Sequence, residues 1–201
     1  PGSRPQLFYQ SGFQLLMIRP FINRINPFRK KWKRRSPHLW ITGGLPVAFF
    51  FISVLLTAFE IRHPEPFVLD YPANFGSRFS IPADNPTTQE GVYLGRMLFY
   101  EPMLSADNSI SCAGCHQQKL AFTDGKKFSD GIHGALTSRN AMSLANLLWV
   151  RQYFWDGRAS SLEEQAAFPL TDPHEMGQSL EESVRKLQAT DAYPPLFKQA
   201  F

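Results

Sequence analysis

The chain has 201 residues, a length that accommodates one or two domains. It carries 21 basic and 17 acidic side chains, but nine of the basic residues and none of the acidic ones fall within residues 1–38. The rest of the chain is therefore acidic on balance, with 12 basic and 17 acidic side chains. The formal net charge of +4 consequently does not indicate nucleic-acid binding, and we expect no nucleic-acid partner.

A basic cluster at residues 29–35 directly precedes an apolar run that predicts a membrane-spanning helix. The run from Leu39 to Phe59 has 21 residues without a charge. At about 1.5 Å rise per residue, such a helix crosses a hydrocarbon core of roughly 30 Å. We expect a basic cytoplasmic segment over residues 1–38, a transmembrane anchor over residues 39–59, and the following chain on the opposite side of the membrane. A cleaved signal peptide and a buried soluble helix are the alternative interpretations.

Residues 60–86 have the composition of a proline-rich linker. Five prolines interrupt them, and no helical periodicity remains between those prolines. We expect a folded domain over residues 87–201. Its first helix is predicted to begin at Thr87, because Thr87 and Glu90 form a capping-box pattern. The apolar positions that would form the buried face of this helix are Val92, Gly95, Leu98 and Phe99.

The remainder of the domain is predicted to be helical and rich in loops. The expected elements in chain order are a loop (101–111), a helical turn (112–117), a long irregular segment (118–138) and a helix (140–149). Capping boxes beginning at Ser160 and Ser161 predict a helix that ends near Phe168, and Ser179 begins another one. No segment has a convincing strand pattern, so the predicted fold class is all-α.

Cys112-Ala113-Gly114-Cys115-His116 is a C-x-x-C-H motif, and it contains both cysteines of the chain. Two thiols one helical turn apart can each form a thioether bond to a haem vinyl group, and the following histidine can supply the proximal iron ligand. The alternative is a zinc or redox C-x-x-C pair. Because a structural zinc ion takes four protein ligands, His133 and His174 would have to complete that site. The motif therefore predicts one covalently bound haem c, which places the domain in a cytochrome c-like class.

Short phrases on both sides of this motif resemble a known family. In chain order they are residues 94–99, 104–105, 109–116, 131–134, 139–140, 154–159, 164–166 and 175–176. This series resembles the N-terminal, peroxidatic haem domain of the bacterial di-haem cytochrome c peroxidases and of the related methylamine-utilisation di-haem enzymes. The resemblance covers roughly residues 87–201. It implies a loop-rich cytochrome c-like haem domain, here preceded by one transmembrane helix.

The resemblance also implies an activity and its partners. The family reduces hydrogen peroxide to water with electrons from a small periplasmic donor, either a cytochrome c or a copper protein. Those electrons pass through a second haem, which is bound to a second C-x-x-C-H motif. This chain has a single such motif. We therefore interpret it as a fragment that lacks the C-terminal haem domain, and as inactive by itself.

Each site residue has a role that the resemblance implies. His116 is the proximal ligand, and His133 is the distal ligand that binds the oxidised iron and leaves on reductive activation. Its neighbouring glycines suit such movement, and a surface loop histidine is the alternative interpretation. Other candidates for the sixth ligand are His174, Met97, Met103, Met142 and Met176.

Glu175 and Gln165 correspond to two polar residues of the peroxide pocket. A carboxyl group can transfer the proton that cleavage of the O–O bond requires, and an amide can orient peroxide by hydrogen bonding. Without the resemblance, Glu175 would be interpreted as a solvated surface charge. Trp155 corresponds to an aromatic side chain between the two haems, and a large core anchor is the alternative interpretation.

Further implications concern metals, charge and location. Asn140 corresponds to a residue that helps to bind calcium between the two family domains. Arg139 and Arg158 are candidates for pairing with haem propionates, on chemical grounds alone. The expected location is the bacterial inner membrane with the haem domain facing the periplasm, and a homodimer is a candidate assembly. Two other activities stay open: a methylamine-utilisation-type di-haem oxidase and a mono-haem electron-transfer cytochrome c.

Overall fold

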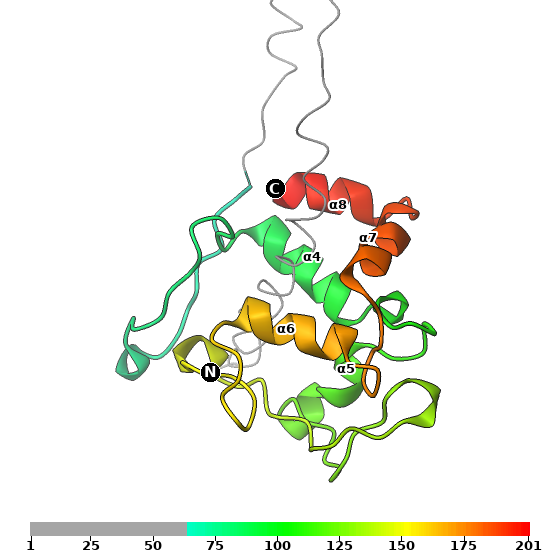
Figure 1. Ribbon diagram of the computed structural model, residues 1–201. Helices are drawn as coiled ribbons and strands as arrows, with labels where there is room; N and C mark the ends of the chain where they lie inside the picture. The colour runs from blue at the N-terminus through cyan, green and yellow to red at the C-terminus, as the bar shows by residue number, and fades with distance from the viewer. Residues whose placement is uncertain (1–63) are drawn as a thin grey trace, which may run out of the picture. The chain divides into compact units, whose positions relative to one another are not determined.

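The computed structural model describes residues 64–201; the predicted basic segment and membrane anchor lie outside these residues. The described chain contains α4 (Gln89–Phe99), α5 (Cys112–Cys115), α6 (Leu162–Thr171), α7 (Leu180–Gln188) and α8 (Tyr193–Ala200) (Figure 1). Short 3₁₀ turns and isolated bridges connect them, and residues 64–201 form no β-strand. The all-α prediction is confirmed. Within the same residues, no helix is both long enough and apolar enough to cross a membrane.

The capping patterns located three helix starts, one of them displaced by a residue. Ser161 and Ser179 each accept a hydrogen bond from the backbone N–H three residues later, at 3.1 Å, and so cap α6 and α7 as predicted. For α4 the cap is Thr88, which accepts from Gly91 N at 3.0 Å, and the predicted cap at Thr87 is wrong. The carboxylate of Glu90 instead accepts from the backbone N–H of Glu65 at 2.9 Å.

The predicted helix over residues 140–149 is wrong, because only Leu147–Trp149 form a 3₁₀ turn there. The hydroxyl of Ser143 donates to Ala121 O at 2.7 Å and accepts from Ala145 N at 3.2 Å, so it competes with helical hydrogen bonds. Asn146 has a φ of 60°, a left-handed conformation that no α-helix tolerates.

The C-terminal helix α8 was not predicted from the sequence. Its two prolines occupy the first turn. At that position the missing backbone N–H has no helical partner to lose. Tyr193, Phe197 and Ala200 of α8 are buried. They face α4, which lies alongside α8 (Figure 1).

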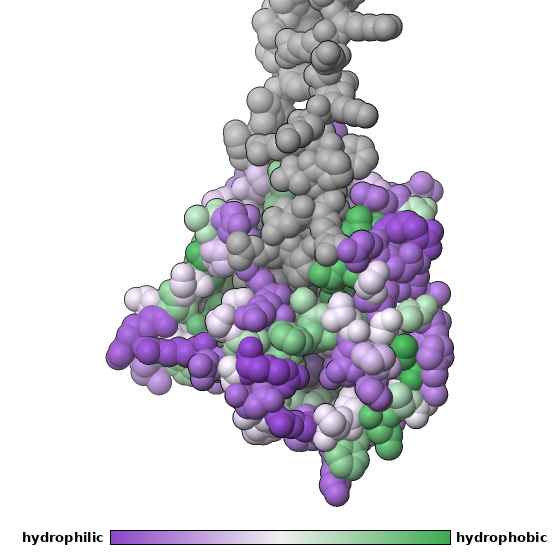
Figure 2. All heavy atoms as spheres, viewed as in Figure 1, coloured by the Kyte–Doolittle hydropathy of each residue, from purple (hydrophilic) through white to green (hydrophobic). Residues whose placement is uncertain are grey.

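Two apolar clusters form the core of the described domain. The first joins α4, α6, α7 and α8 through residues that include Leu98, Leu170 and Leu187. The second contains Phe99, Phe122, Leu144, Tyr153, Ala159, Leu162 and Ala166. Cys112 packs against both clusters, so the C-x-x-C-H motif is fixed at their junction. On the face seen in Figure 2, hydrophilic and hydrophobic residues are interspersed over the part of the surface that carries colour.

The described part of the predicted linker packs on the domain through one tryptophan. Tyr71, Phe75 and Phe79 each meet the Trp149 ring edge-on, with ring centroids 5.3, 4.9 and 5.4 Å apart. The indole Nε1 of Trp149 also donates to the backbone oxygen of Gly76 at 3.0 Å. Residues 71–79 are therefore tied to the 147–149 turn.

Candidate functional site

The C-x-x-C-H motif adopts the single helical turn that its spacing predicts. In α5 the backbone N–H of His116 donates to Cys112 O at 2.9 Å, so Cys112 and Cys115 lie on adjacent turns of one face. Burial raises the pKa of the Cys112 thiol to about 12 and that of Cys115 to about 11. A redox C-x-x-C pair needs a thiolate, whereas a raised pKa favours the protonated thiol. Among residues 64–201, no three His, Cys, Asp or Glu side chains gather as a metal-binding group.

His116 is held in the state that an iron ligand requires. Its Nδ1 lies 2.9 Å from the carbonyl oxygen of Phe122; assigned as the donor there, Nδ1 leaves Nε2 with the lone pair. Burial lowers the pKa of His116, and backbone hydrogen bonds involving Phe122 and Met142 oppose that effect. The imidazole is therefore held neutral and fixed in orientation, as metal binding needs.

A strained turn presents the Phe122 carbonyl to His116. Ala121 and Phe122 both adopt positive φ angles, 54° and 62°, although neither is glycine. Such angles cost of order 1–3 kcal/mol each and persist only where the surroundings enforce them. The turn is closed by hydrogen bonds from Phe122 N to Gln117 O at 2.9 Å and from Gln117 N to Thr123 O at 3.0 Å, and the Phe122 ring is buried.

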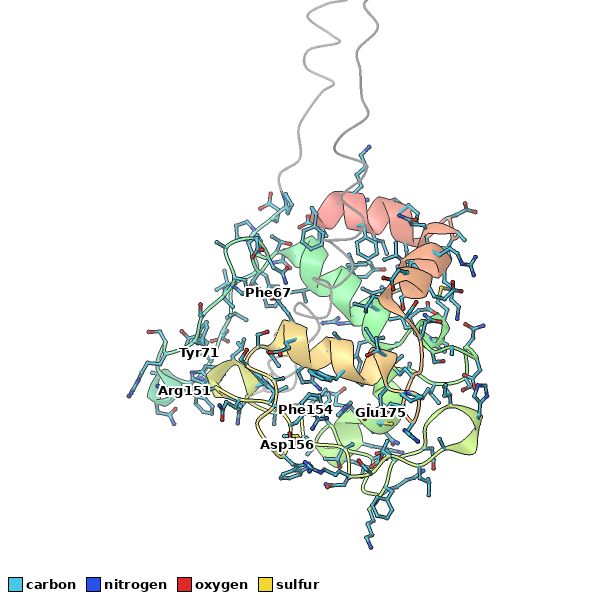
Figure 3. All side chains as sticks on the ribbon, viewed as in Figure 1. Phe67, Tyr71, Arg151, Phe154, Asp156 and Glu175 are labelled. Atoms are coloured by element: carbon cyan, nitrogen blue, oxygen red, sulfur yellow. The ribbon has the colours of Figure 1, made fainter. Side chains whose placement is uncertain are left out.

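A cavity of about 300 Å³ opens beside His116 and brings the predicted pocket residues together. Gln165 and Pro169 are one turn apart on α6 and line one wall, and Glu175 lines it from the turn that follows α6. Figure 3 shows Phe154, Asp156 and Glu175 gathered below α6. The Oε1 atom of Gln165 is buried and has no hydrogen-bond partner, so this wall offers an unused acceptor.

Glu175 is not the solvated surface charge that the sequence pattern alone suggested. Burial raises the pKa of its carboxyl, the negative charge of Asp172 adds to that effect, and Arg158 opposes it. Its backbone is fixed on both sides, since its N–H donates to Asp172 O at 3.0 Å and its carbonyl accepts from Ile132 N at 2.9 Å. The side chain is thus a carboxyl group with a raised pKa in the cavity wall.

Two arginines converge on one aspartate at the mouth of the cavity. Arg158 Nη1 lies 2.9 and 3.0 Å from the two carboxylate oxygens of Asp156, and Arg139 Nη1 lies 3.2 Å from Oδ2. The Arg158 guanidinium also stacks 3.6 Å above the Phe154 ring. Two guanidinium groups therefore lie together in the cavity lining, where their geometry suits the carboxylates of haem propionates.

His133 lies outside the cavity. It sits in the 3₁₀ turn Ile132–Gly134 with a φ of 55°, and its side chain is 72% exposed. Its Nδ1 lies 3.4 Å from Asp107 Oδ2. The described conformation therefore does not bring His133 and His116 together, and a distal-ligand role for His133 stays a prediction. Of the other candidate ligands, Met142 lines the cavity, Met176 is buried in the core, and His174 is exposed beside Asp172.

Trp155 and Asn140 occupy the rim of the cavity. Trp155 is 60% exposed, so the alternative interpretation as a core anchor is wrong. Its Nε1 donates to the backbone oxygen of Asn140 at 3.4 Å, and both residues line the opening. The exposed indole leaves this edge available for further contacts, and a calcium role for Asn140 stays a prediction.

The residues of this site fit a covalently attached haem. A neutral histidine with an oriented ring, an unpartnered acceptor and two guanidinium groups border one cavity, and the two thiols lie on the helical turn that leads into that histidine. Phe122, Phe154 and Asp156 were not singled out from the sequence. Phe122 contributes its backbone carbonyl, Phe154 its ring face, and Asp156 a carboxylate that two arginines share. None of these features has a sequence signature.

A family model described as di-haem cytochrome c peroxidase matches residues 89–201. The chain belongs to the di-haem cytochrome c peroxidase family. The family implies haem c as cofactor, in agreement with the C-x-x-C-H turn and its histidine. The match begins at the first residue of α4 and runs through α8, so it includes every residue that lines the cavity.

Individual relatives come from both branches of this family. The methylamine utilization protein MauG of Methylorubrum extorquens is 43% identical over 120 residues, which are 60% of this chain and 34% of that protein. The cytochrome c peroxidase Ccp of Escherichia coli is 42% identical over 109 residues, 54% of this chain and 23% of that protein. A crystal structure of a MauG-like protein associated with microbial copper homeostasis has a TM-score of 0.61 at 39% identity, covering 67% of this chain and 40% of that one. The chain thus spans less than half the length of these relatives.

Proposed function

We propose that this chain provides the peroxidatic haem c domain of a di-haem enzyme that reduces hydrogen peroxide to water. The observation that carries the proposal is the cavity in which Glu175 and Gln165 meet His116. When bound, the haem would supply an iron that exchanges electrons with peroxide. The overall reaction consumes one hydrogen peroxide, two electrons and two protons and yields two waters.

Cys112, Cys115 and His116 would hold that haem. The thiols would form the two thioether bonds, and His116 Nε2 would be the proximal ligand, because its Nδ1 is engaged by Phe122. Arg158 and Arg139 would receive the propionate groups, with Asp156 fixing both guanidinium planes. Each of these residues is already oriented by contacts within the described chain.

Glu175 and Gln165 would handle peroxide. A carboxyl with a raised pKa keeps a proton at a higher pH than an exposed one, so Glu175 can transfer that proton to the departing oxygen as a general acid. The unpartnered Oε1 of Gln165 can accept a hydrogen bond from the hydroxyl of peroxide and so orient it.

Electrons would enter through a second haem domain and the exposed Trp155 at the cavity rim. Their source would be a small periplasmic cytochrome c or copper protein, and the enzyme would be tethered to the bacterial inner membrane through residues 39–59. Covalent haem attachment to C-x-x-C-H supports the periplasmic location, because in bacteria that attachment is a periplasmic process. A second haem, calcium at Asn140 and a homodimer belong to the same proposal.

A methylamine-utilisation-type oxidase is the second candidate. The outward position of His133 favours it, since an iron without a permanent distal ligand can act on a protein or a small molecule. The 43% identity to a MauG protein also supports this second candidate. A mono-haem electron carrier would instead need two permanent iron ligands and would not react with peroxide.

One set of variants of the full-length, haem-loaded enzyme tests the proposal. The wild type should keep its haem absorbance after denaturation and acid–acetone extraction, and Cys112→Ser/Cys115→Ser should lose it. Glu175→Gln should lower peroxide turnover by about 10²–10⁴-fold, the usual contribution of a general acid. Glu182→Gln is the matched control, because Glu182 pairs with Arg185 on α7 outside the cavity. Equal turnover in the two variants would contradict the role of Glu175, and an unreactive, low-spin haem in both redox states would favour the carrier.

A further inference from the structure

His133 occupies its outward position in a conformation that needs support. Its φ of 55° lies in the left-handed region, where a non-glycine residue is disfavoured relative to the right-handed one. With 72% of its side chain exposed, packing contributes little to holding it there. Backbone hydrogen bonds from Ile132 N to Glu175 O at 2.9 Å and from Ala135 N to Ile132 O at 3.0 Å hold the turn on either side of His133, so what remains to be explained is the direction of its exposed side chain.

Asp107 is oriented to hold that side chain. Its Oδ1 accepts from Ser109 N at 3.0 Å and from Ser109 Oγ at 2.6 Å. Its Oδ2 lies 3.4 Å from both the backbone nitrogen and the Nδ1 of His133. One carboxylate oxygen thus fixes the side chain to its own loop, while the other faces His133 at two points.

The loop that carries Asp107 is itself rigidly held. On either side of Asp107, the ammonium group of Lys186 donates to Ser105 O at 2.8 Å and to Asn108 Oδ1 at 2.7 Å. Between them, Ala106 N donates to Met176 O at 2.9 Å. The Asp107 carboxylate is therefore held in place at the surface, beside the ligand candidate His133 and outside the cavity.

We propose that Asp107 is a positioning residue that holds His133 away from the iron and so keeps the sixth coordination position open. The inference rests on the proposed function, in which His133 binds the oxidised iron and must leave before peroxide can enter. Asp107 and the iron compete for His133. A stronger contact between Asp107 and His133 lowers the fraction of iron that is bound by His133.

The test measures that ratio in the full-length, haem-loaded enzyme. Electron paramagnetic resonance distinguishes low-spin iron bound by His133 from high-spin iron without it, and the apparent affinity for cyanide reports the open fraction. Asp107→Ala should raise the ratio of His133-bound to His133-free iron roughly two- to five-fold, the range for loss of an exposed ion pair. Asp107→Asn, which keeps acceptors for Ser109 but loses the charge, should give a smaller shift in the same direction.

Two controls separate the outcomes. Asp191→Ala removes an exposed carboxylate at a distant position and should leave the ratio unchanged. In a His133→Ala background, Asp107→Ala should have no spectroscopic effect, because the competing ligand is gone; a general structural role would still perturb the spectrum.

Two results would overturn the inference in distinguishable ways. If Asp107→Ala and Asp107→Asn leave the ratio at the Asp191→Ala value while His133→Ala abolishes the low-spin signal of the iron held by His116, Asp107 has no positioning role and His133 remains the ligand. If His133→Ala leaves the low-spin signal of that iron intact, the ligand role in the proposed function fails, and the inference fails with it. Should Asp107→Ala not fold, as shown by circular dichroism, Asp107→Asn alone decides between these results.

Discussion

Adding a single methyl group at Gly131 should strongly lower the stability of the folded domain around the candidate site. A Cβ atom built on Gly131 would lie 1.9 Å from the backbone oxygen of His174 and 2.7 Å from its carbonyl carbon. Real Cβ atoms do not approach so closely, and backbone atoms cannot rotate away as a side-chain end can. Gly131→Ala must therefore separate the loop that carries His133 from the turn that carries Glu175.

The expected cost follows from the contacts that this separation breaks. Overpacking costs about 1–3 kcal/mol. The hydrogen bonds from Gly131 N to Ala135 O at 2.8 Å and from Ile132 N to Glu175 O at 2.9 Å would lengthen or break. At about 0.5–1.5 kcal/mol each, they bring the total to about 2–6 kcal/mol. At roughly 3 °C per kcal/mol for a domain of this size, the thermal midpoint should fall by roughly 6–18 °C.

The assay is thermal unfolding of the haem-loaded protein followed by far-ultraviolet circular dichroism. Gly134→Ala is the matched control in the same loop, because nothing lies within 4 Å of its would-be Cβ and its φ is 75°. That variant should lose about 1–2 kcal/mol, from backbone strain alone. A midpoint for Gly131→Ala equal to or above that of Gly134→Ala would refute the argument that the two segments pack backbone to backbone.

Three further predictions use denaturation. Leu98→Ala should cost about 2–5 kcal/mol in urea unfolding because Leu98 is fully buried, whereas Met97→Ala, on the exposed side of the same helix, should change stability by less than about 1 kcal/mol. Ser161→Ala should cost about 0.5–2 kcal/mol by removing the acceptor for Glu164 N; an unchanged unfolding midpoint would contradict its capping role. Because burial raises the pKa of Glu175, the folded state binds its proton more tightly than the unfolded chain, and stability falls as pH rises from the ordinary glutamate range through the raised pKa. Glu175→Gln should remove that decline, so its unfolding free energy should exceed that of the wild type increasingly towards neutral pH and match it in acid.

The C-x-x-C-H turn and the starts of α6 and α7 were predictable because their causes are local. Thioether attachment needs two thiols one turn apart, and a serine cap needs a backbone N–H three residues later. Both requirements can be checked within five residues of sequence. Helix 140–149 failed for the opposite reason, since the hydroxyl of Ser143 bonds to Ala121, which lies far away in the sequence.

The sequence by itself determined the C-x-x-C-H motif for haem c and the all-α class, and the family resemblance predicted Gln165, Glu175 and His133 as site residues. Only the tertiary structure decided which of them share a cavity: Gln165 and Glu175 line the same space as His116, whereas His133 is directed to Asp107 on the surface. Loop residues carry no periodicity that fixes their direction. Their placement depends on backbone contacts between distant segments, such as Gly131 against His174 and Ile132 against Glu175. These contacts join segments that lie far apart in the sequence, so residue spacing does not encode them.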